Sequence, residues 1–212
     1  MSRFLVLSVI VFAAVAVLPA APIPCPESGA LTLLTGMDSE GCIVQDKIFS
    51  NFAYSGDIPA TDVNVNLVLQ TGNTDIHGWS FVPENAWQVG FTLSYDITVG
   101  PGFPLVAIIQ SKDQMNSGAI PNGVSVTDFQ TGVTPSPLTL SGATGIETIF
   151  SDLYSLQSVH TETTATVGAG SNLLSYEQLF IESTGVPEPM SFVLIGSGLL
   201  GLGLLRRRAS KS

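Results

Sequence analysis

The chain has 212 residues, a length that fits one ordinary domain with additional segments at its ends. Hydrophobic residues make up 45% of it, which excludes disorder by composition, and the formal net charge of −10 argues against nucleic acid as a partner. Five of the seven basic residues lie within the first three or last seven positions, and all seventeen acidic residues lie between Arg3 and Arg206. Basic ends around an acidic body are typical of a chain that is directed to a membrane or across one.

Residues 1–20 have the features of a secretory signal peptide. An arginine precedes an apolar run over residues 4–18, and the small residues Ala20 and Ala21 follow it. The run is shorter than the about 20 residues that a spanning helix needs. We therefore expect export through the Sec translocon across the inner membrane and cleavage by signal peptidase after Ala20 or Ala21. The alternatives are cleavage nearer residues 14–16 and an uncleaved N-terminal anchor.

The two cysteines, Cys25 and Cys42, follow the expected cleavage site. Export places them in an oxidising compartment, where an even pair is read as a disulfide. The bond would close a loop of about 18 residues and stabilise the fold by about 3 kcal/mol. A thiol nucleophile or a metal site is the alternative, but two cysteines with two distant histidines make a poor zinc set. We expect a disulfide and no bound metal.

Residues 21–184 form the body, and their pattern predicts strands. Trp87 to Val99 alternates strictly, with apolar side chains at the odd positions, and Asp62 to Gln70 repeats this pattern with Leu69 among the inward residues. Only two segments, Thr148–Tyr154 and Leu173–Phe180, also suggest a helix. Glycine- and proline-rich turns separate the runs, which indicates an all-β fold, an antiparallel β-sandwich or jelly-roll. Further strands are expected over residues 105–110, 123–129 and 138–140 and within residues 155–167.

Sequence motifs for catalysis are absent from the chain. It has no G-x-S-x-G, H-E-x-x-H, phosphate-binding loop or EF-hand loop. His77 resembles a residue in a turn that enters a strand, and His160 is explained by a hydrated strand face. Residues 196–201 spell G-x-G-x-x-G, but the preceding strand and the later acidic residue of a dinucleotide site are missing. We predict no catalytic residue, no cofactor and no enzymatic activity.

Two groups of side chains allow either a structural or a binding interpretation. Trp79, Phe81 and Trp87 could stack on a sugar, but aromatic residues dominate cores, so we expect them to be buried. Four threonines could form a flat face for ice or sugar, but we favour the interpretation of a solvated strand of β-branched polar residues. These are Thr161, Thr163, Thr164 and Thr166.

The C-terminal segment, residues 185–212, has three parts in a fixed order. Val186, Pro187, Glu188 and Pro189 come first, and an uncharged, glycine-rich apolar stretch over residues 190–205 follows. The stretch ends at three consecutive cations, which stop a translocating chain on the cytoplasmic side and argue against a buried core helix. The cations are Arg206, Arg207 and Arg208.

This tail resembles the PEP-CTERM sorting signal of Gram-negative bacteria. The resemblance covers only residues 186–212 and says nothing about the body. It implies a transient transmembrane helix over residues 190–205, processing by an exosortase near the Pro-Glu-Pro, and a producer that makes exopolysaccharide. The alternative is a permanent anchor in which the prolines only begin the helix.

Together these features predict an exported, non-enzymatic cell-surface or extracellular-matrix protein. Its body would lie in the periplasm while the tail holds it, and afterwards at the cell surface or outside the cell. The alternatives are a carbohydrate-binding module for exopolysaccharide and a secreted hydrolase whose site is assembled only in three dimensions.

Overall fold

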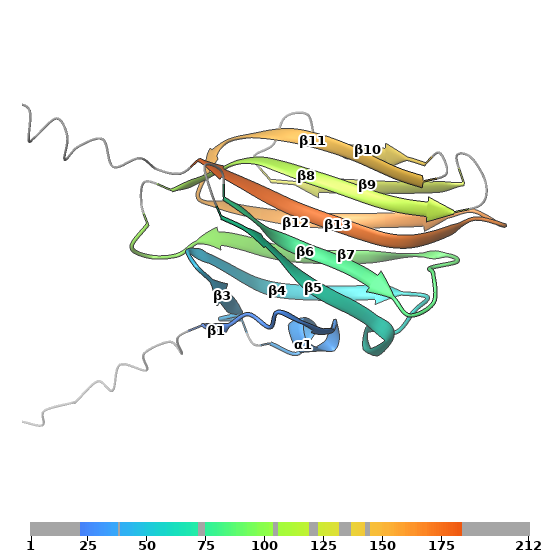
Figure 1. Ribbon diagram of the computed structural model, residues 1–212, viewed down its shortest axis with the longest axis horizontal. Coiled ribbons are helices and arrows are strands. Elements are labelled where there is room, and N and C mark those ends of the chain that lie inside the picture. The colour runs from blue at the N-terminus through green and yellow to red at the C-terminus, as the bar shows by residue number, and fades with distance from the viewer. Residues whose placement is uncertain are drawn as a thin grey trace, which may run out of the picture.

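The body of the protein is a β-sandwich of two sheets (Figure 1). The computed structural model describes residues 22–37, 39–71, 75–103, 106–118, 123–131, 137–142 and 145–183. The predicted signal peptide, sorting motif, apolar stretch and arginine cluster lie outside these residues. Among the described residues, no helix has the length and apolar character needed to cross a membrane.

One sheet has seven strands and the other has six, and almost all neighbouring strands are antiparallel. The seven-stranded sheet consists, in spatial order, of β1 (Ile23–Pro24), β3 (Cys42–Val44), β4 (Lys47–Gly56), β7 (Gly90–Val99), β12 (Ser158–Val167), β9 (Val124–Gln130) and β10 (Leu138–Ser141). The six-stranded sheet consists of β11 (Gly145–Leu156), β8 (Ala107–Gly118), β13 (Asn172–Ser183), β6 (Ile76–Pro83), β5 (Val63–Gln70) and β2 (Ser28–Ala30). Two short helical turns, α1 (Thr32–Thr35) and η1 (Ala60–Asp62), complete the described elements. The predicted antiparallel sandwich is therefore confirmed.

Strand β7 shows how the alternating pattern sets the core. Phe91, Leu93, Tyr95 and Ile97 point inward and are buried, as the odd-numbered pattern predicts. The prediction is wrong at Val89, which is exposed because the strand begins only at Gly90. Gly90 has a φ of 129°, and the Asp57 carboxylate accepts hydrogen bonds from the backbone N–H groups of residues 88–90. The residues just before Gly90 therefore do not follow the alternation of side chains that β7 shows.

Three further predictions need correction. The segments Thr148–Tyr154 and Leu173–Phe180 are not helical, because they lie within β11 and β13, where partner strands satisfy their backbone groups. The strand expected over residues 105–110 continues to Gly118. Leu69 has the predicted inward parity but stays exposed, since it lies near the end of β5, where it lines a groove.

The predicted disulfide between Cys25 and Cys42 is present. Its Cα atoms are 4.7 Å apart, and it joins the chain beside β1 to the first residue of β3, with which β1 pairs in parallel. Within the loop that it closes, Leu31 and Leu34 are buried, whereas Leu33 is exposed. The disulfide therefore fastens the N-terminal segment to the edge of the seven-stranded sheet.

Candidate functional site

A polar cluster lies between the sheets, where β8 and β13 face β9 and β12. Asp128 is its centre: one carboxylate oxygen accepts hydrogen bonds from the hydroxyl groups of Thr161 and Thr163, at 2.6 and 2.9 Å. Its other oxygen accepts from the side-chain amides of Gln130 and Gln178. All five side chains are buried. Thr161 and Thr163 therefore face inward, unlike Thr164 and Thr166 on the same strand, so the four threonines form no common face.

A second carboxyl group lies in the same cluster. The Tyr176 hydroxyl donates to Asp113 at 2.8 Å. Burial raises the pKa of Asp113 well above its ordinary value, and the neighbouring Asp128 raises it further. Burial also raises the pKa of Asp128, against the lowering effect of the hydroxyl and amide donors around it. The two carboxyl groups therefore share one proton. Asp113 carries it, because fewer hydrogen-bond donors surround Asp113 than Asp128 to stabilise a negative charge.

A second buried cluster contains charged groups from both sheets. Lys47 Nζ lies 2.7 Å from Asp46 Oδ2 and 2.7 Å from Glu182 Oε1. His77 Nδ1 lies 2.5 Å from the same Glu182 oxygen, and its Nε2 lies 2.8 Å from Gln45 Oε1. Asp46, His77 and Glu182 are a donor set that could hold a metal ion. The ammonium group of Lys47 already contacts both carboxylates, so these residues fit an ion cluster better than a metal site.

The outer face of the seven-stranded sheet carries the strongest candidate for a ligand site. Side chains directly opposite on antiparallel strands share one face, so the register places Ser94, Glu162 and Phe129 side by side across β7, β12 and β9. Phe129 is 51% exposed, and Glu162 is also exposed. Hydroxyl groups fill the next two rows: Thr92, Thr164, Thr127 and Thr139, then Thr166, Ser125 and Ser141.

Polar groups beside this row are held in place by one another. His160 Nδ1 lies 2.6 Å from Asp96 Oδ1, and Asn51 Nδ2 donates to Asp96 Oδ2 at 2.6 Å. Asn51 reaches Asp96 because β4 has a bulge there, with a φ of 56° at Asn51. The Thr131 hydroxyl accepts a 2.9 Å hydrogen bond from the His160 backbone N–H. These partners fix the orientation of an imidazole and a carboxylate at the surface.

A groove of about 170 Å³ opens on the same face. Residues of β4 and β7 form its walls, and Glu162 of β12 contributes the charged group of its lining. The remaining lining residues are Ala53, Tyr54, Ser55, Thr92, Leu93 and Ser94. We call Phe129, Glu162, His160, Asp96 and this groove the outer-face site.

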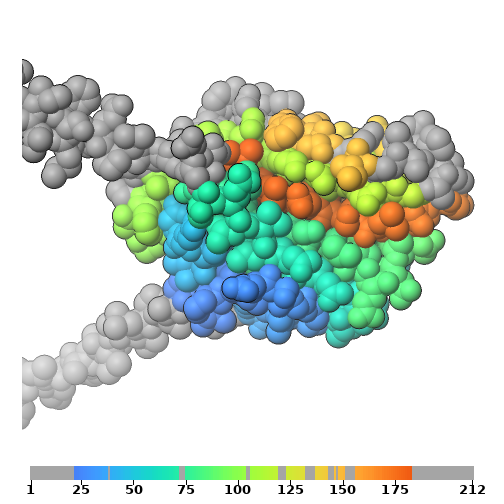
Figure 2. Space-filling view, in the orientation of Figure 1, coloured from blue at the N-terminus to red at the C-terminus, as the bar shows by residue number. Residues whose placement is uncertain are grey.

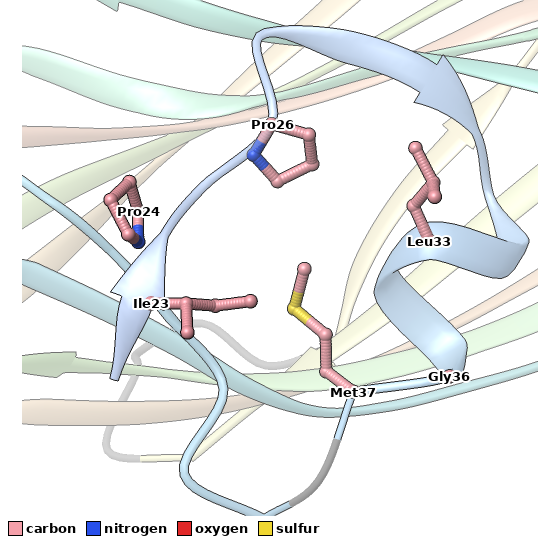
Figure 3. Close-up of a pocket in the computed structure, with 6 residues that line it drawn as sticks. All are labelled: Ile23, Pro24, Pro26, Leu33, Gly36 and Met37. Carbon is pink, nitrogen blue, oxygen red and sulfur yellow. The ribbon is translucent and has the colours of Figure 1, made fainter. Parts of the chain in front are cut away.

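The apolar pocket of Figure 3 lies apart from the outer-face site. Ile23 and Met37 point toward each other across it, Leu33 of α1 closes one side, and Pro24 and Pro26 line another. The pocket is built from the disulfide-fastened N-terminal segment and the turn after α1. It offers apolar contact but few polar groups to orient a ligand, which a specific small-molecule site requires.

The residues that the sequence singled out are distributed over several places. Trp79, Phe81 and Trp87 are buried in the core, as expected. His160 lies on an exposed strand face, also as expected. His77 lies within β6 and is fully buried in the ion cluster, so its expected place in a turn is wrong. Phe129 was missed, although Val124 and Val126 point inward by parity and therefore place residue 129 on the opposite face.

No protein-family model matches the chain, and no curated protein matches it. Among solved structures, TmCBM61 in complex with β-1,4-galactotriose is 12% identical, with 62% of this chain and 84% of that chain covered and a TM-score of 0.32. The carbohydrate-binding module CBM6cm-2 of Cellvibrio mixtus lichenase 5A, in complex with cellotriose, is 15% identical, with 56% and 86% covered and a TM-score of 0.30. The mannan-recognising module TmCBM27 is 7% identical, with 74% and 96% covered and a TM-score of 0.34. Likenesses this weak support no conclusion about this chain.

Proposed function

We propose that the protein is an exported, non-enzymatic surface or matrix protein that binds a neutral polysaccharide at the outer-face site. The observation that carries the proposal is the exposed ring of Phe129 directly opposite Glu162 on the neighbouring strand. An aromatic ring offers an apolar surface to the C–H face of a sugar. A carboxylate beside it accepts charge-assisted hydrogen bonds from sugar hydroxyl groups.

The arrangement around Phe129 favours a neutral ligand of extended shape. Asp96 and Glu162 are both acidic, and the body of the chain carries an excess of negative charge, so an anionic polysaccharide would be repelled. The hydroxyl rows extend the polar surface along the sheet on the side of Phe129 away from His160. A polar strip next to one ring suits a chain of sugar units better than a single small molecule.

The other sheet face offers a useful contrast. Phe150 of β11 is 54% exposed, but its cross-strand neighbour is Lys112, and Leu179 follows on β13. Lys112 pairs with Glu177 at 3.4 Å. An exposed ring alone therefore does not distinguish the two faces, whereas the oriented polar groups and the groove favour the seven-stranded sheet.

A hydrolase would need titratable groups that a substrate can reach. The carboxyl pair Asp113 and Asp128 has the raised pKa values typical of a catalytic pair. Both side chains are buried, and hydroxyl and amide groups of the protein occupy the oxygens of Asp128. These contacts favour a structural role for the pair.

Substitution of Phe129 tests the binding proposal. The purified protein is screened on an array that carries both neutral and anionic glycans, and the affinity for the best neutral oligosaccharide is measured by calorimetry. We expect Phe129→Ala to weaken binding about tenfold, which corresponds to about 1.4 kcal/mol. Phe150→Ala is the matched control, because it removes an equally exposed ring from the other sheet, and it should leave the affinity unchanged. Equal losses from both variants, or binding only to anionic glycans, would contradict the proposal.

We further propose that the C-terminal segment is the sorting signal that its resemblance implies. The prolines on both sides of Glu188 favour an extended backbone that a protease cleft can accept, and Glu188 gives this stretch its charge. In a host that has the exosortase, wild type should lose the arginine cluster, whereas Glu188→Ala should keep it. The mass of the C-terminal peptide decides this, and retention of the cluster in wild type would identify a permanent anchor instead.

A further inference from the structure

The ion cluster contains a fully buried amine in direct contact with a carboxyl group of the opposite sheet. Lys47 begins β4 in the seven-stranded sheet, and Glu182 lies near the end of β13 in the six-stranded sheet. Lys47 is 0% exposed and Glu182 is 3% exposed. The amine nitrogen and the nearer carboxyl oxygen are 2.7 Å apart. This contact joins the two layers at the end of the sandwich where β4 begins and β13 ends (left in Figure 1).

We propose that Lys47 and Glu182 condense to form an intramolecular amide, an isopeptide bond between Nζ and Cδ. Holding both groups in contact inside the fold gives them a high effective concentration. Burial penalises the charged forms of both groups, whereas the amide carries no charge. The same burial excludes the water that would hydrolyse the product. The inference is independent of glycan binding and of sorting.

The other two members of the cluster lie where the reaction needs a base and an acid. Asp46 Oδ2 is 2.7 Å from the amine and accepts protons from it. His77 Nδ1 is 2.5 Å from Glu182 Oε1, the oxygen that leaves, and delivers protons to it. The ligating atoms of Asp46, His77 and Glu182 lie within 4.8 Å of one another, a span that the water molecule released by the condensation can bridge to pass a proton from base to acid.

The condensation is balanced without any external reagent. After Asp46 has taken one of the three ammonium protons, the neutral amine nitrogen bonds to the Glu182 carboxyl carbon, and the bond from that carbon to Oε1 breaks. Of the three ammonium protons, one stays on the amide nitrogen and two leave with Oε1 as water. Asp46 and His77 relay these two protons and end in their original protonation states. No oxidant or reductant takes part.

The expected consequence is a covalent tie across the sandwich. The bond would connect positions that are 182 − 47 = 135 residues apart, whereas the disulfide connects positions 17 residues apart. It would join β4 to β13 directly, so that most of the described strands lie within the closed loop. A force applied between the start of the body and its C-terminal end would then be borne by a covalent bond.

Mass spectrometry of the reduced and denatured full-length protein tests the proposal. We expect the intact mass to be lower than the sequence mass by one water molecule, after allowance for any terminal processing seen in the peptide map. Trypsin should fail to cleave after Lys47 but should cleave after Lys112. Lys112 is the internal control, because it pairs with Glu177 in a partly exposed contact of the same chemical type.

Lys47→Arg provides the second arm, since it keeps the positive charge but removes the amine. This variant should show the full sequence mass. If wild type has the full mass and is cut after Lys47, the proposal is overturned. It is equally overturned if Lys47→Arg loses the same water molecule, because the loss then arises elsewhere in the chain. The wild-type measurement decides the question even if the variant does not fold.

Discussion

The two halves of the inter-sheet core are built from different chemistry. Between β4 and β7 on one side and β5 and β6 on the other, the space is filled by aromatic rings. Phe49 and Trp79 meet edge to face with centroids 5.6 Å apart, and Phe52 stacks on Tyr95 at 4.9 Å. Burial of large apolar surface supplies the stabilisation of this half.

The other half is a hydrogen-bonded polar layer. It lies between β8 and β13 of the six-stranded sheet and β9 and β12 of the seven-stranded sheet. Asp128 accepts four hydrogen bonds there, and burial raises the pKa of Tyr176 well above 10, so its hydroxyl group stays protonated. A buried polar network contributes when its members are satisfied and costs free energy when they are not. The aromatic half should therefore respond to loss of volume, and the polar half to loss of a single acceptor.

Truncation of the aromatic half should have the largest effect on stability. Trp79 is fully buried and contacts both Phe49 and Phe52, so Trp79→Ala leaves a cavity between the sheets. We expect a loss of about 3–5 kcal/mol in the free energy of unfolding. Urea denaturation followed by circular dichroism measures it. A loss below about 1 kcal/mol would mean that packing of the aromatic half contributes little to the free energy of unfolding.

An isosteric change in the polar half should have a smaller but clear effect. In Asp128→Asn, an NH₂ group replaces one acceptor oxygen and must face hydroxyl or amide donors. Leaving a buried donor unpaired costs about 1–3 kcal/mol. The same denaturation series measures this loss. An unchanged unfolding free energy would contradict the assignment of Asp128 as the charged acceptor of the layer.

The same substitution at the neighbouring carboxyl group should be nearly neutral at about pH 4 and stabilising at higher pH. Asp113→Asn replaces a protonated carboxyl group with an amide of similar shape, and the Tyr176 hydroxyl can still donate to the remaining oxygen. The folded pKa of Asp113 lies above its ordinary 3.8. The folded state therefore holds a proton that the unfolded state releases, and the stability contributed by this group is lost as pH rises through the folded pKa.

Denaturation of wild type and Asp113→Asn over a pH series checks this asymmetry. The unfolding free energy of wild type should decline as pH rises above about 4, in the range that begins at the unfolded pKa. The variant should decline less, so the difference between the two should grow with pH in favour of the variant. Parallel pH profiles would contradict the protonation of Asp113.

The contrast between the halves also explains which parts of the fold the sequence could predict. Where the inward side chains are apolar, as in Phe91, Leu93 and Tyr95 of β7, the period of two identifies both the strand and its buried face. In β8, Met115 is apolar among the inward residues from Ser111 onward, whereas Ser111, Asp113 and Ser117 are as polar as the outward ones. Hydrophobic periodicity therefore carries no signal over the second part of β8, and the predicted strand ended too early.

The candidate site was only partly predictable for a related reason. The exposed position of His160 follows from its place in an alternating strand, but its contact with Asp96 depends on the register between β12 and β7. Asn51 reaches this pair only because β4 is bulged. Register and bulges result from the assembly of distant segments, which a single sequence does not display.

The most direct test of the central claim is a map of where a sugar binds. Amide chemical shifts of the isotope-labelled protein are followed by NMR while the best neutral oligosaccharide of the array is added. We expect the shifted amides to cluster around Ser94, Phe129 and Glu162 on the seven-stranded sheet. The outer face of the six-stranded sheet, which Figure 2 shows, should stay unchanged, and the amides of Phe150 and Glu177 report on this sheet. Shifts confined to that face, or to the apolar pocket around Ile23 and Met37, would contradict the outer-face site.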